Sequence, residues 1–125
     1  MPGSIILIGG EPGIGKSTLM LQVALNQGRK VLYVSGEESE HQIKLRADRI
    51  TSKNKENAWI LSETDIDKVF NQAKQLAPDL LIIDSIQTLT SRQLESVAGS
   101  VGQVRHCAGE LLKYAKQTHV PVFLV

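Results

Sequence analysis

The feature that most constrains this chain is the glycine-rich pattern G-x-x-x-x-G-K-S at residues 10–17. It follows an apolar run, residues 4–8, and leads into a helical pattern that begins near Lys16. A strand, a glycine-rich loop and a helix in this order can cradle polyphosphate, because backbone N–H groups of the loop turn inward around its oxygens. We therefore predict a nucleotide-binding loop made by Gly10, Glu11, Pro12, Gly13, Ile14, Gly15, Lys16, Ser17 and Thr18.

The polar residues of this loop have separate chemical roles. Lys16 supplies a fixed positive charge near the β and γ phosphates, and the Ser17 hydroxyl is a ligand for Mg²⁺. The helix that follows directs the positive end of its dipole at the same anion. A glycine turn that served packing alone does not require Lys and Ser next in the chain, so phosphate binding is the better interpretation.

Apolar runs and helical patterns alternate along the whole chain. The predicted strands cover residues 5–8, 30–35, 58–61, 80–84 and 120–125, and the predicted helices cover residues 16–27, 40–50, 65–76 and 100–118. This alternation predicts an α/β fold, a doubly wound parallel sheet with right-handed crossovers. Ligands of such sheets bind at the carboxyl ends of the strands. The glycine-rich loop, Glu37 and Asp84 all fall at that edge.

The helix ends and faces follow from capping residues and apolar spacing. We expect helices to begin after Ser39, Thr64 and Ser100, which are good N-caps. Trp59, in a short apolar strand, is expected in the core. Residues 88–99 are polar and form a predicted loop that is long enough to suggest a function. The core face of the last helix is expected to hold Val101, Val104, Ala108, Leu111, Leu112 and Ala115.

Three acidic residues follow predicted strands. Asp84 ends four consecutive aliphatic residues, which is the Walker B pattern, and its carboxylate is expected to hold Mg²⁺ through a water. Glu37 and Glu38 follow another strand. Hydrolysis needs a carboxylate that orients and deprotonates the attacking water, so one of them is the candidate base. The residues alone leave that choice open.

The motifs favour ATP over GTP and an ATPase over a kinase. Residues 84–87 are not D-x-x-G, and residues 54–57 lack the final Asp of N-K-x-D. The alternative class, a small-molecule kinase, requires a lid with paired arginines over the phosphates. Arg92 alone, in the loop of residues 88–99, is a poor match to such a lid.

Composition excludes several other classes. Of 125 residues, 42% are hydrophobic and 22% are charged, which is typical of a folded, water-soluble domain. The net charge of +1 gives no basic excess for nucleic acid, so DNA binding must depend on a local patch or an assembly. The N-terminal apolar run is too short to span a membrane. We expect a cytoplasmic protein without membrane contact.

The remaining reactive side chains have unremarkable interpretations. The single cysteine, Cys107, excludes an internal disulfide and is expected to be a packed helix residue. The three histidines, His41, His106 and His119, lack the spacing of metal ligands. The basic residues of one helix and the segment after it form either a nucleic-acid patch or a solvated surface; they are Lys44, Arg46, Arg49 and Lys53.

Four segments together resemble the ATPase core of the bacterial RadA (Sms) family of DNA-repair proteins. They are G-E-P-G-I-G-K-S-T-L from residue 10, V-L-Y-V-S-G-E-E-S with Q-I-K-L-R-A after it, P-D-L-L-I-I-D-S-I-Q-T, and G-S-V-x-Q-V-R. The segments S-G-E-E-S and D-S-I-Q-T are the most specific part of this resemblance, because a generic P-loop protein would not share them. The resemblance implies a RecA-like P-loop ATPase that works as a hexameric motor, binds single-stranded DNA and promotes branch migration.

The resemblance also assigns residue roles and a strand order. Glu37 takes the catalytic glutamate role beside Lys16, Asp84 takes the Walker B role, and ATP with Mg²⁺ is the implied ligand. Gln87 and Thr88 become candidate sensors of the γ-phosphate or of a subunit interface. Residues 88–99 resemble a loop that faces the central channel, so Arg92 and Arg105 become candidate DNA contacts. The implied strand order, by position in the chain, is 3-2-4-5-1.

Family members carry modules that this sequence does not show. These are an N-terminal four-cysteine zinc module, a later Lys-Asn-Arg-Phe-Gly motif and a C-terminal Lon-protease-like domain, so the resemblance implies that residues 1–125 are part of a RecA-like domain. Two hypotheses remain. One is a DNA-stimulated motor ATPase, and the other is a nucleotide-binding RecA relative that forms regulatory rings without acting on DNA.

Overall fold

The computed structural model of the chain describes residues 5–7, 30–50, 58–91 and 99–124. The predicted phosphate loop, the helix predicted after it and Arg92 lie outside the described residues. The structure therefore tests the sheet and three of the predicted helices. It also shows the surroundings of the predicted site residues that it describes, which are Glu37, Asp84, Gln87, Thr88 and Arg105.

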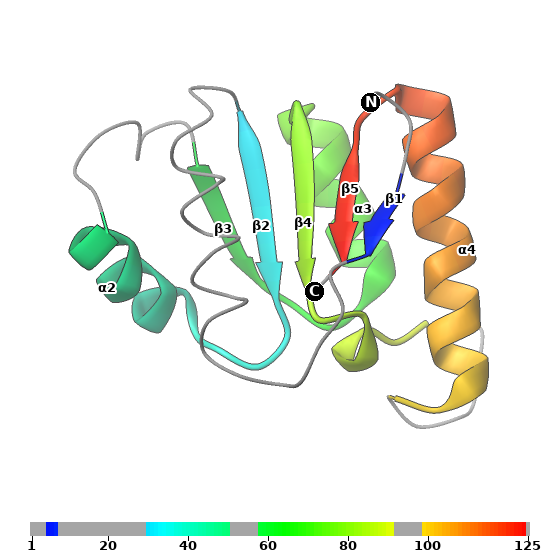
Figure 1. Cartoon of the computed structure of the whole chain (residues 1–125), viewed down its shortest axis with the longest axis horizontal. Coiled ribbons are helices and arrows are strands. Elements are labelled where there is room, and N and C mark those ends of the chain that lie inside the picture. Colours follow the sequence, from blue (N-terminus) through cyan, green and yellow to red (C-terminus); the bar gives the residue numbers. More distant parts are fainter. Residues whose placement is uncertain (1–4, 8–29, 51–57, 92–98, 125) are drawn as a thin grey trace.

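A five-stranded parallel sheet forms the centre of the fold (Figure 1). Its strands are β1 (Ile5–Leu7), β2 (Val31–Ser35), β3 (Ala58–Ser62), β4 (Leu80–Asp84) and β5 (Val122–Leu124). Their spatial order is β1-β5-β4-β2-β3, which is the implied order 3-2-4-5-1 read from the other edge. The predicted fold class is confirmed. Because every pair is parallel, the carboxyl ends share one edge, the lower one in Figure 1.

The helices α3 (Ile66–Leu76) and α4 (Val101–Thr118) pack against one face of this sheet. The strands supply every second residue to that core, because successive side chains of a strand point to opposite faces. The strand residues are Leu32, Val34, Leu81, Ile83, Val122 and Leu124. From α3 come Ile66, Val69 and Ala73 at helical spacing, as predicted.

The opposite face of the sheet is also closed to solvent. Val31, Tyr33 and Ile82 are wholly buried there. By the same alternation, Ser35 on β2 and Asp84 on β4 belong to this face. The candidate site residues of β2 and β4 thus lie across the sheet from α3 and α4.

Helix α2 (Glu40–Ile50) follows β2 and contacts the edge strand β3. The predicted N-cap is confirmed: Ser39 Oγ accepts the Gln42 N–H at 3.2 Å, and Gln42 Oε1 accepts the Ser39 N–H at 3.0 Å. These reciprocal bonds form a capping box. Ile43 is wholly buried, so α2 is fixed to the sheet next to the turn that carries Glu37.

The predicted start of α3 is wrong by one residue. The N-cap is Asp65, whose Oδ1 accepts the Asp67 N–H at 3.0 Å. Thr64 instead uses its carbonyl to accept the Thr90 N–H at 2.8 Å, so it belongs to a contact between two loops. At the other end, Ala77 adopts a left-handed conformation, and Pro78 follows where the helix was predicted to end.

The predicted core face of α4 is confirmed in part, since Leu111 and Ala115 are buried and Val104 and Ala108 pack against the core. The prediction is wrong for Val101, which is 69% exposed, and for Leu112, which is 39% exposed; Gln103 and Cys107 are buried as well. The polar Gln103 replaces an apolar residue in this stripe because its amide is satisfied by backbone groups of Ser91. The bounds predicted for the helix, with Ser100 as N-cap, are confirmed.

Trp59 was expected in the core, and this prediction is wrong. Its side chain is 39% exposed on β3, at the edge of the sheet. The Lys30 ammonium lies 5.9 Å from the centre of its ring, a cation–π distance that partly shields the ring. An edge strand has fewer neighbours to cover a large side chain.

Candidate nucleotide site at the carboxyl edge of the sheet

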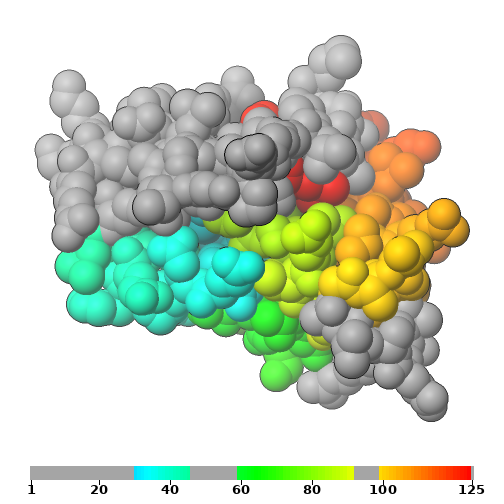
Figure 2. Space-filling model, turned by 60° about the horizontal axis from the view of Figure 1, so that its bottom comes forward, coloured from blue at the N-terminus to red at the C-terminus, as the bar shows by residue number. Residues whose placement is uncertain are grey.

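Strands β2 and β4 end together at the edge where a nucleotide is expected. Ser35 lies opposite Asp84 in the register, and the next residue of the turn, Gly36, donates its N–H to the Asp84 carbonyl at 3.1 Å. Figure 2 shows the segment after β2 in cyan beside the segment after β4 in yellow-green. β1 ends at the same edge, and the glycine-rich sequence comes directly after it in the chain.

The turn after β2 is held by Ser35, which is 1% exposed. Ser35 Oγ accepts the N–H groups of Glu37 at 3.4 Å and Glu38 at 3.1 Å. The Glu38 carbonyl in turn accepts the Ser62 hydroxyl at 3.0 Å, which ties the turn to β3. Glu37 is exposed while Glu38 is half-buried. Glu37 is therefore the more accessible of the two acids at this edge.

Asp84 is half-buried at the end of β4. The hydroxyl of Tyr33, a wholly buried residue of β2, donates a hydrogen bond to Asp84 Oδ2 at 2.8 Å. The peptide bond between Asp84 and Ser85 is cis. The Walker B carboxylate thus lies where the sequence predicted it, with a protein donor on one of its oxygens.

The candidate sensors Gln87 and Thr88 belong to a short 3-10 turn, η2 (Ile86–Thr88), directly after β4. Gln87 is exposed, whereas Thr88 is half-buried and its hydroxyl donates to the Ser85 carbonyl at 2.7 Å. The Thr88 side chain also lies directly over Gly36, where a Cβ would overlap its Oγ1 and Cβ atoms. Thr88 therefore touches the turn that carries Glu37.

The predicted irregular loop begins with residues that are packed, which corrects its expected extent. Leu89 is 1% exposed and Ser91 is 3% exposed. Thr90 pairs with Asp65 in an isolated parallel bridge, and Ser91 is bonded through both backbone groups to the Gln103 amide. Residues 89–91 thus belong to the folded core. Of the two candidate DNA contacts, Arg105 is exposed on α4, and Arg92 lies outside the described residues.

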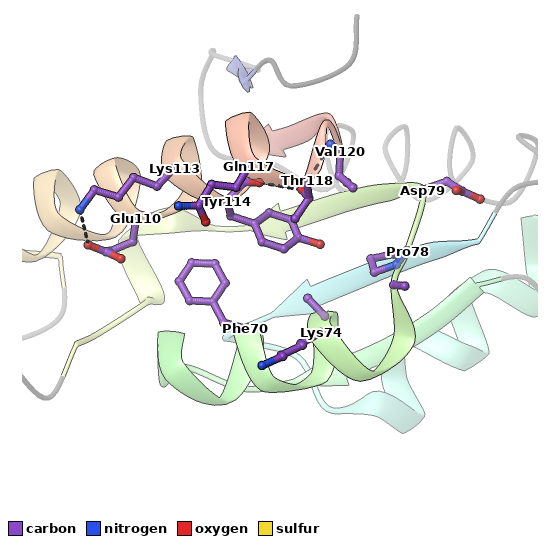
Figure 3. A pocket seen from close by; sticks show the side chains of 12 residues that line it. Phe70, Lys74, Pro78, Asp79, Glu110, Lys113, Tyr114, Gln117, Thr118 and Val120 are labelled. Carbon is purple, nitrogen blue, oxygen red and sulfur yellow. Dashed lines mark hydrogen bonds and ion pairs between the residues drawn. The ribbon is translucent and has the colours of Figure 1, made fainter.

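A cleft of about 740 Å³ lies between α3 and α4 (Figure 3). The rings of Phe70 and Tyr114 line it and are stacked with centroids 5.7 Å apart. Pro78 and Asp79, which line it, precede β4, so the cleft lies toward the amino ends of the strands. Nucleotides bind parallel sheets at the opposite ends. The cleft is therefore not the nucleotide site.

The single cysteine matches its interpretation as a packed helix residue. Cys107 is wholly buried in the core of α4, as predicted, and burial raises the pKa of its thiol to about 11. Within residues 30–50, 58–91 and 99–124, no group of histidine, cysteine and acidic side chains has the arrangement of a metal site. None of the helices described by the structure has the length and apolar character needed to cross a membrane.

The sequence of this chain matches a known family of ATPases. The model of the ATPase family associated with various cellular activities (AAA) matches residues 6–125. The chain belongs to this family. Membership of an AAA ATPase family agrees with the glycine-rich loop and with a Walker B aspartate at the end of β4.

Curated bacterial proteins match this chain along 98–100% of its length. It is 50% identical to DNA repair protein RadA of Streptococcus pneumoniae, over 100% of this chain and 30% of that protein. It is 48% identical to the RadA protein of Bacillus subtilis over 98% of this chain, and 49% identical to that of Aquifex aeolicus over 98%. The resemblance predicted from motifs is confirmed. The chain spans less than a third of the length of these relatives.

An AAA ATPase domain implies a nucleotide, and the residues at this edge fit the Mg²⁺ that usually accompanies it. Carboxylate and hydroxyl oxygens are the ligands that Mg²⁺ prefers. Asp84 offers such a carboxylate at the edge, and its Oδ2 accepts a hydrogen bond from the Tyr33 hydroxyl. Asp84 and the Ser17 hydroxyl are the residues that would hold the ion.

Sequence reasoning missed Tyr33, Ser35 and the contact between Gly36 and Thr88. Tyr33 occupies an apolar position of a buried strand, so its pattern indicates packing and gives no sign of its hydroxyl partner. Ser35 was recognised only as the end of a strand. A hint was present in the sequence, because a serine followed by glycine and two acids is typical of a side-chain-stabilised turn.

Proposed function

We propose that this chain is the core of an ATPase that binds Mg-ATP and hydrolyses it to drive DNA repair. The observation that carries the proposal is the register of Ser35 opposite Asp84. It brings a candidate base and a candidate metal-binding carboxylate to the edge at which the glycine-rich segment leaves β1. Family membership supports an ATPase, and the names of the relatives support a role in DNA repair.

The residues divide the chemistry among them. Residues 10–18 bind the phosphates, with Lys16 contributing charge at the β and γ positions. Ser17 and Asp84 would hold Mg²⁺, which would supply positive charge beside the phosphates. Glu37 orients the attacking water and accepts its proton. Its exposure and its attachment to the rigid Ser35 turn suit a base that meets water at the γ-phosphate.

The motor function rests on the motif resemblance rather than on the site. We propose that the full-length protein forms a homo-hexamer that binds single-stranded DNA and recombination intermediates and promotes branch migration. Arg92 and Arg105 are the proposed DNA contacts on the channel side. Arg105 is exposed on the first half of α4.

The decisive experiment is the ATPase rate of the full-length protein with and without single-stranded DNA, with mass measured by light scattering. Stimulation by DNA of a hexamer supports the motor. ATP hydrolysis by a ring that neither binds nor responds to DNA favours the regulatory alternative. The control is Lys16→Ala, which removes the positive charge beside the phosphates and must abolish ATP binding. If this variant binds Mg-ATP as well as the wild type, the phosphate-loop assignment is wrong.

A further inference from the structure

A buried tyrosine contacts the Walker B carboxylate from the neighbouring strand. Tyr33 pairs with Ile82 in the register, and Asp84 lies two residues further along β4 on the same face. The phenol therefore reaches diagonally toward the carboxyl edge, where its hydroxyl donates to Asp84 Oδ2 at 2.8 Å. This bond links residues 51 positions apart in the chain.

The bond is suited to holding a side chain in place. A phenol that is wholly buried keeps a hydrogen-bond partner, because an unsatisfied hydroxyl in the interior is costly. Hydrogen bonds to an ionised carboxylate are about twice as strong as those between neutral groups. The ring of Tyr33 is confined by the packed sheet, so the donor itself has little freedom to move. Asp84, by contrast, is half-buried and ends its strand.

We propose that Tyr33 is a positioning residue for Asp84, and that it orients the carboxylate for the Mg²⁺ of the nucleotide site. The inference rests on the proposed metal-holding role of Asp84. Packing alone does not explain the hydroxyl, because Val31 and Ile82 fill the same face with hydrocarbon side chains. Residues that orient metal-holding side chains affect the affinity for the ion even though they do not touch it.

The change Tyr33→Phe removes the hydroxyl and keeps the ring. We expect it to weaken binding of the metal in the nucleotide complex by about 10- to 100-fold, the range typical of such supporting residues. The affinity for nucleotide without metal is expected to stay at the wild-type value, because the phosphate loop is a separate segment of the chain. A structural role for Tyr33 would lower both affinities together.

The experiment uses Mn²⁺ as the probe, titrated by electron paramagnetic resonance into the full-length protein saturated with ADP. ADP affinity in chelator and the melting temperature are measured in parallel. The matched control is Tyr114→Phe, which removes a tyrosine hydroxyl from the cleft between α3 and α4, away from Asp84. Weaker Mn²⁺ binding in Tyr33→Phe alone, with unchanged metal-free ADP affinity, supports the proposal. Wild-type Mn²⁺ affinity in Tyr33→Phe, or an equal loss of metal-free affinity, overturns it.

Two further variants separate this inference from the function on which it rests. In an Asp84→Asn background, Tyr33→Phe should have no additional effect on Mn²⁺ binding, and an undiminished effect contradicts action through Asp84. Replacement of Tyr33 by 4-aminophenylalanine keeps a donor on the ring and should restore wild-type Mn²⁺ affinity. If Tyr33→Phe does not fold, the 4-aminophenylalanine protein is the test. Weak Mn²⁺ binding by that protein in its folded state overturns the inference. Because Mn²⁺ binding is read without turnover, it remains decisive even if the wild type hydrolyses no ATP.

Discussion

The side chain of Thr88 occupies the space that any side chain at residue 36 would need. Thr88 is fixed there by its bond to the Ser85 carbonyl, and Gly36 is fixed by its bond to the Asp84 carbonyl. The turn before Glu37 and the turn after Asp84 are thus packed directly on each other. A substitution that displaces one of these turns is therefore expected to displace the other.

Gly36→Ala is expected to destabilise the protein by about 1–3 kcal/mol, the usual cost of forcing extra atoms into a packed site. ATP hydrolysis should fall as well, because the turn that carries Glu37 must shift. The matched control is Gly109→Ala on α4, where an added Cβ meets nothing within 4 Å. It should raise stability by about 0.5–1 kcal/mol, since alanine is favoured over glycine in a helix. Thermal unfolding and steady-state ATPase measure both variants, and equal stability of the two would contradict the steric argument.

Glu37→Gln should bind Mg-ATP and lose hydrolysis by a factor of about 10² or more, because the amide keeps hydrogen bonds and cannot accept the proton. Glu38→Gln is the control. Glu38 is half-buried and its backbone is fixed by Ser35 and Ser62, so its loss should leave turnover near the wild type. Single-turnover hydrolysis in the full-length protein separates the two. A dead Glu38→Gln with an active Glu37→Gln would show that Glu38 is the base.

Gln103→Leu should destabilise the protein by about 1–3 kcal/mol, because two backbone groups of Ser91 lose the buried amide that bonds them. The measurement is urea unfolding. Gln117→Leu, on the exposed side of the same helix, is the control and should change stability by less than about 0.5 kcal/mol. If the two variants unfold at the same urea concentration, the amide is not a significant anchor. Hydrogen exchange at the Ser91 amide should also quicken in Gln103→Leu.

Stability should decline between pH 9 and pH 11 in part because of Cys107. Burial, with smaller contributions from Glu110 and Asp67, raises the pKa of this thiol from 9.0 to about 11. The folded protein therefore keeps a proton that the unfolded chain releases, and stability falls as the pH rises through this window. Below pH 9 the thiol contributes no pH dependence. Burial also raises the pKa of Tyr114, which adds a loss of the same sign at high pH.

The check is urea unfolding across this pH range for the wild type and Cys107→Ala. The variant should lose less stability between pH 9 and pH 11. Parallel curves for the two proteins would argue against a raised thiol pKa. Alkylation of the native thiol should also be slow at neutral pH, since the thiolate is the reactive form.

Arg105→Ala should weaken binding of single-stranded DNA by the full-length protein and reduce its salt slope by about one, as expected for loss of one phosphate contact. Lys68→Ala, an exposed cation on α3, is the control and should leave the slope unchanged. Fluorescence anisotropy over a range of salt concentrations measures both. An unchanged slope in Arg105→Ala, also when Arg92 is replaced, would place the DNA contact elsewhere.

The sequence allowed the strands and helices to be predicted closely, because apolar runs and caps are local signals. The bounds of α2 were predicted to the residue, and those of α4 differ only by the cap. The family resemblance supplied what local signals cannot, the placement of β5 between β1 and β4. The structure places Asp84 at the end of β4 and Glu37 in the turn after β2, as their positions after apolar runs predicted, whereas their chemical roles stay predictions.

The misplaced features depend on partners that are distant in the chain. Gln103 is polar in sequence, yet it is buried because the backbone of Ser91 satisfies its amide. Tyr33 reads as a core aromatic, and only the pairing of β2 with β4 brings Asp84 within reach of its hydroxyl. Trp59 is apolar, but its strand lies at the edge of the sheet, where few neighbours cover the side chain, so it is partly exposed. Hydrophobic periodicity reports none of these relationships.

The place of β5 in the sheet has a consequence for protein synthesis. The ladder of β2, β3 and β4 can form once residue 84 has left the ribosome, since these strands pair among themselves. β1 instead pairs with β5, as the register of Ile5 opposite Val122 shows. β1 must therefore wait for β5 before it joins the sheet, and pairing over such a separation is slow.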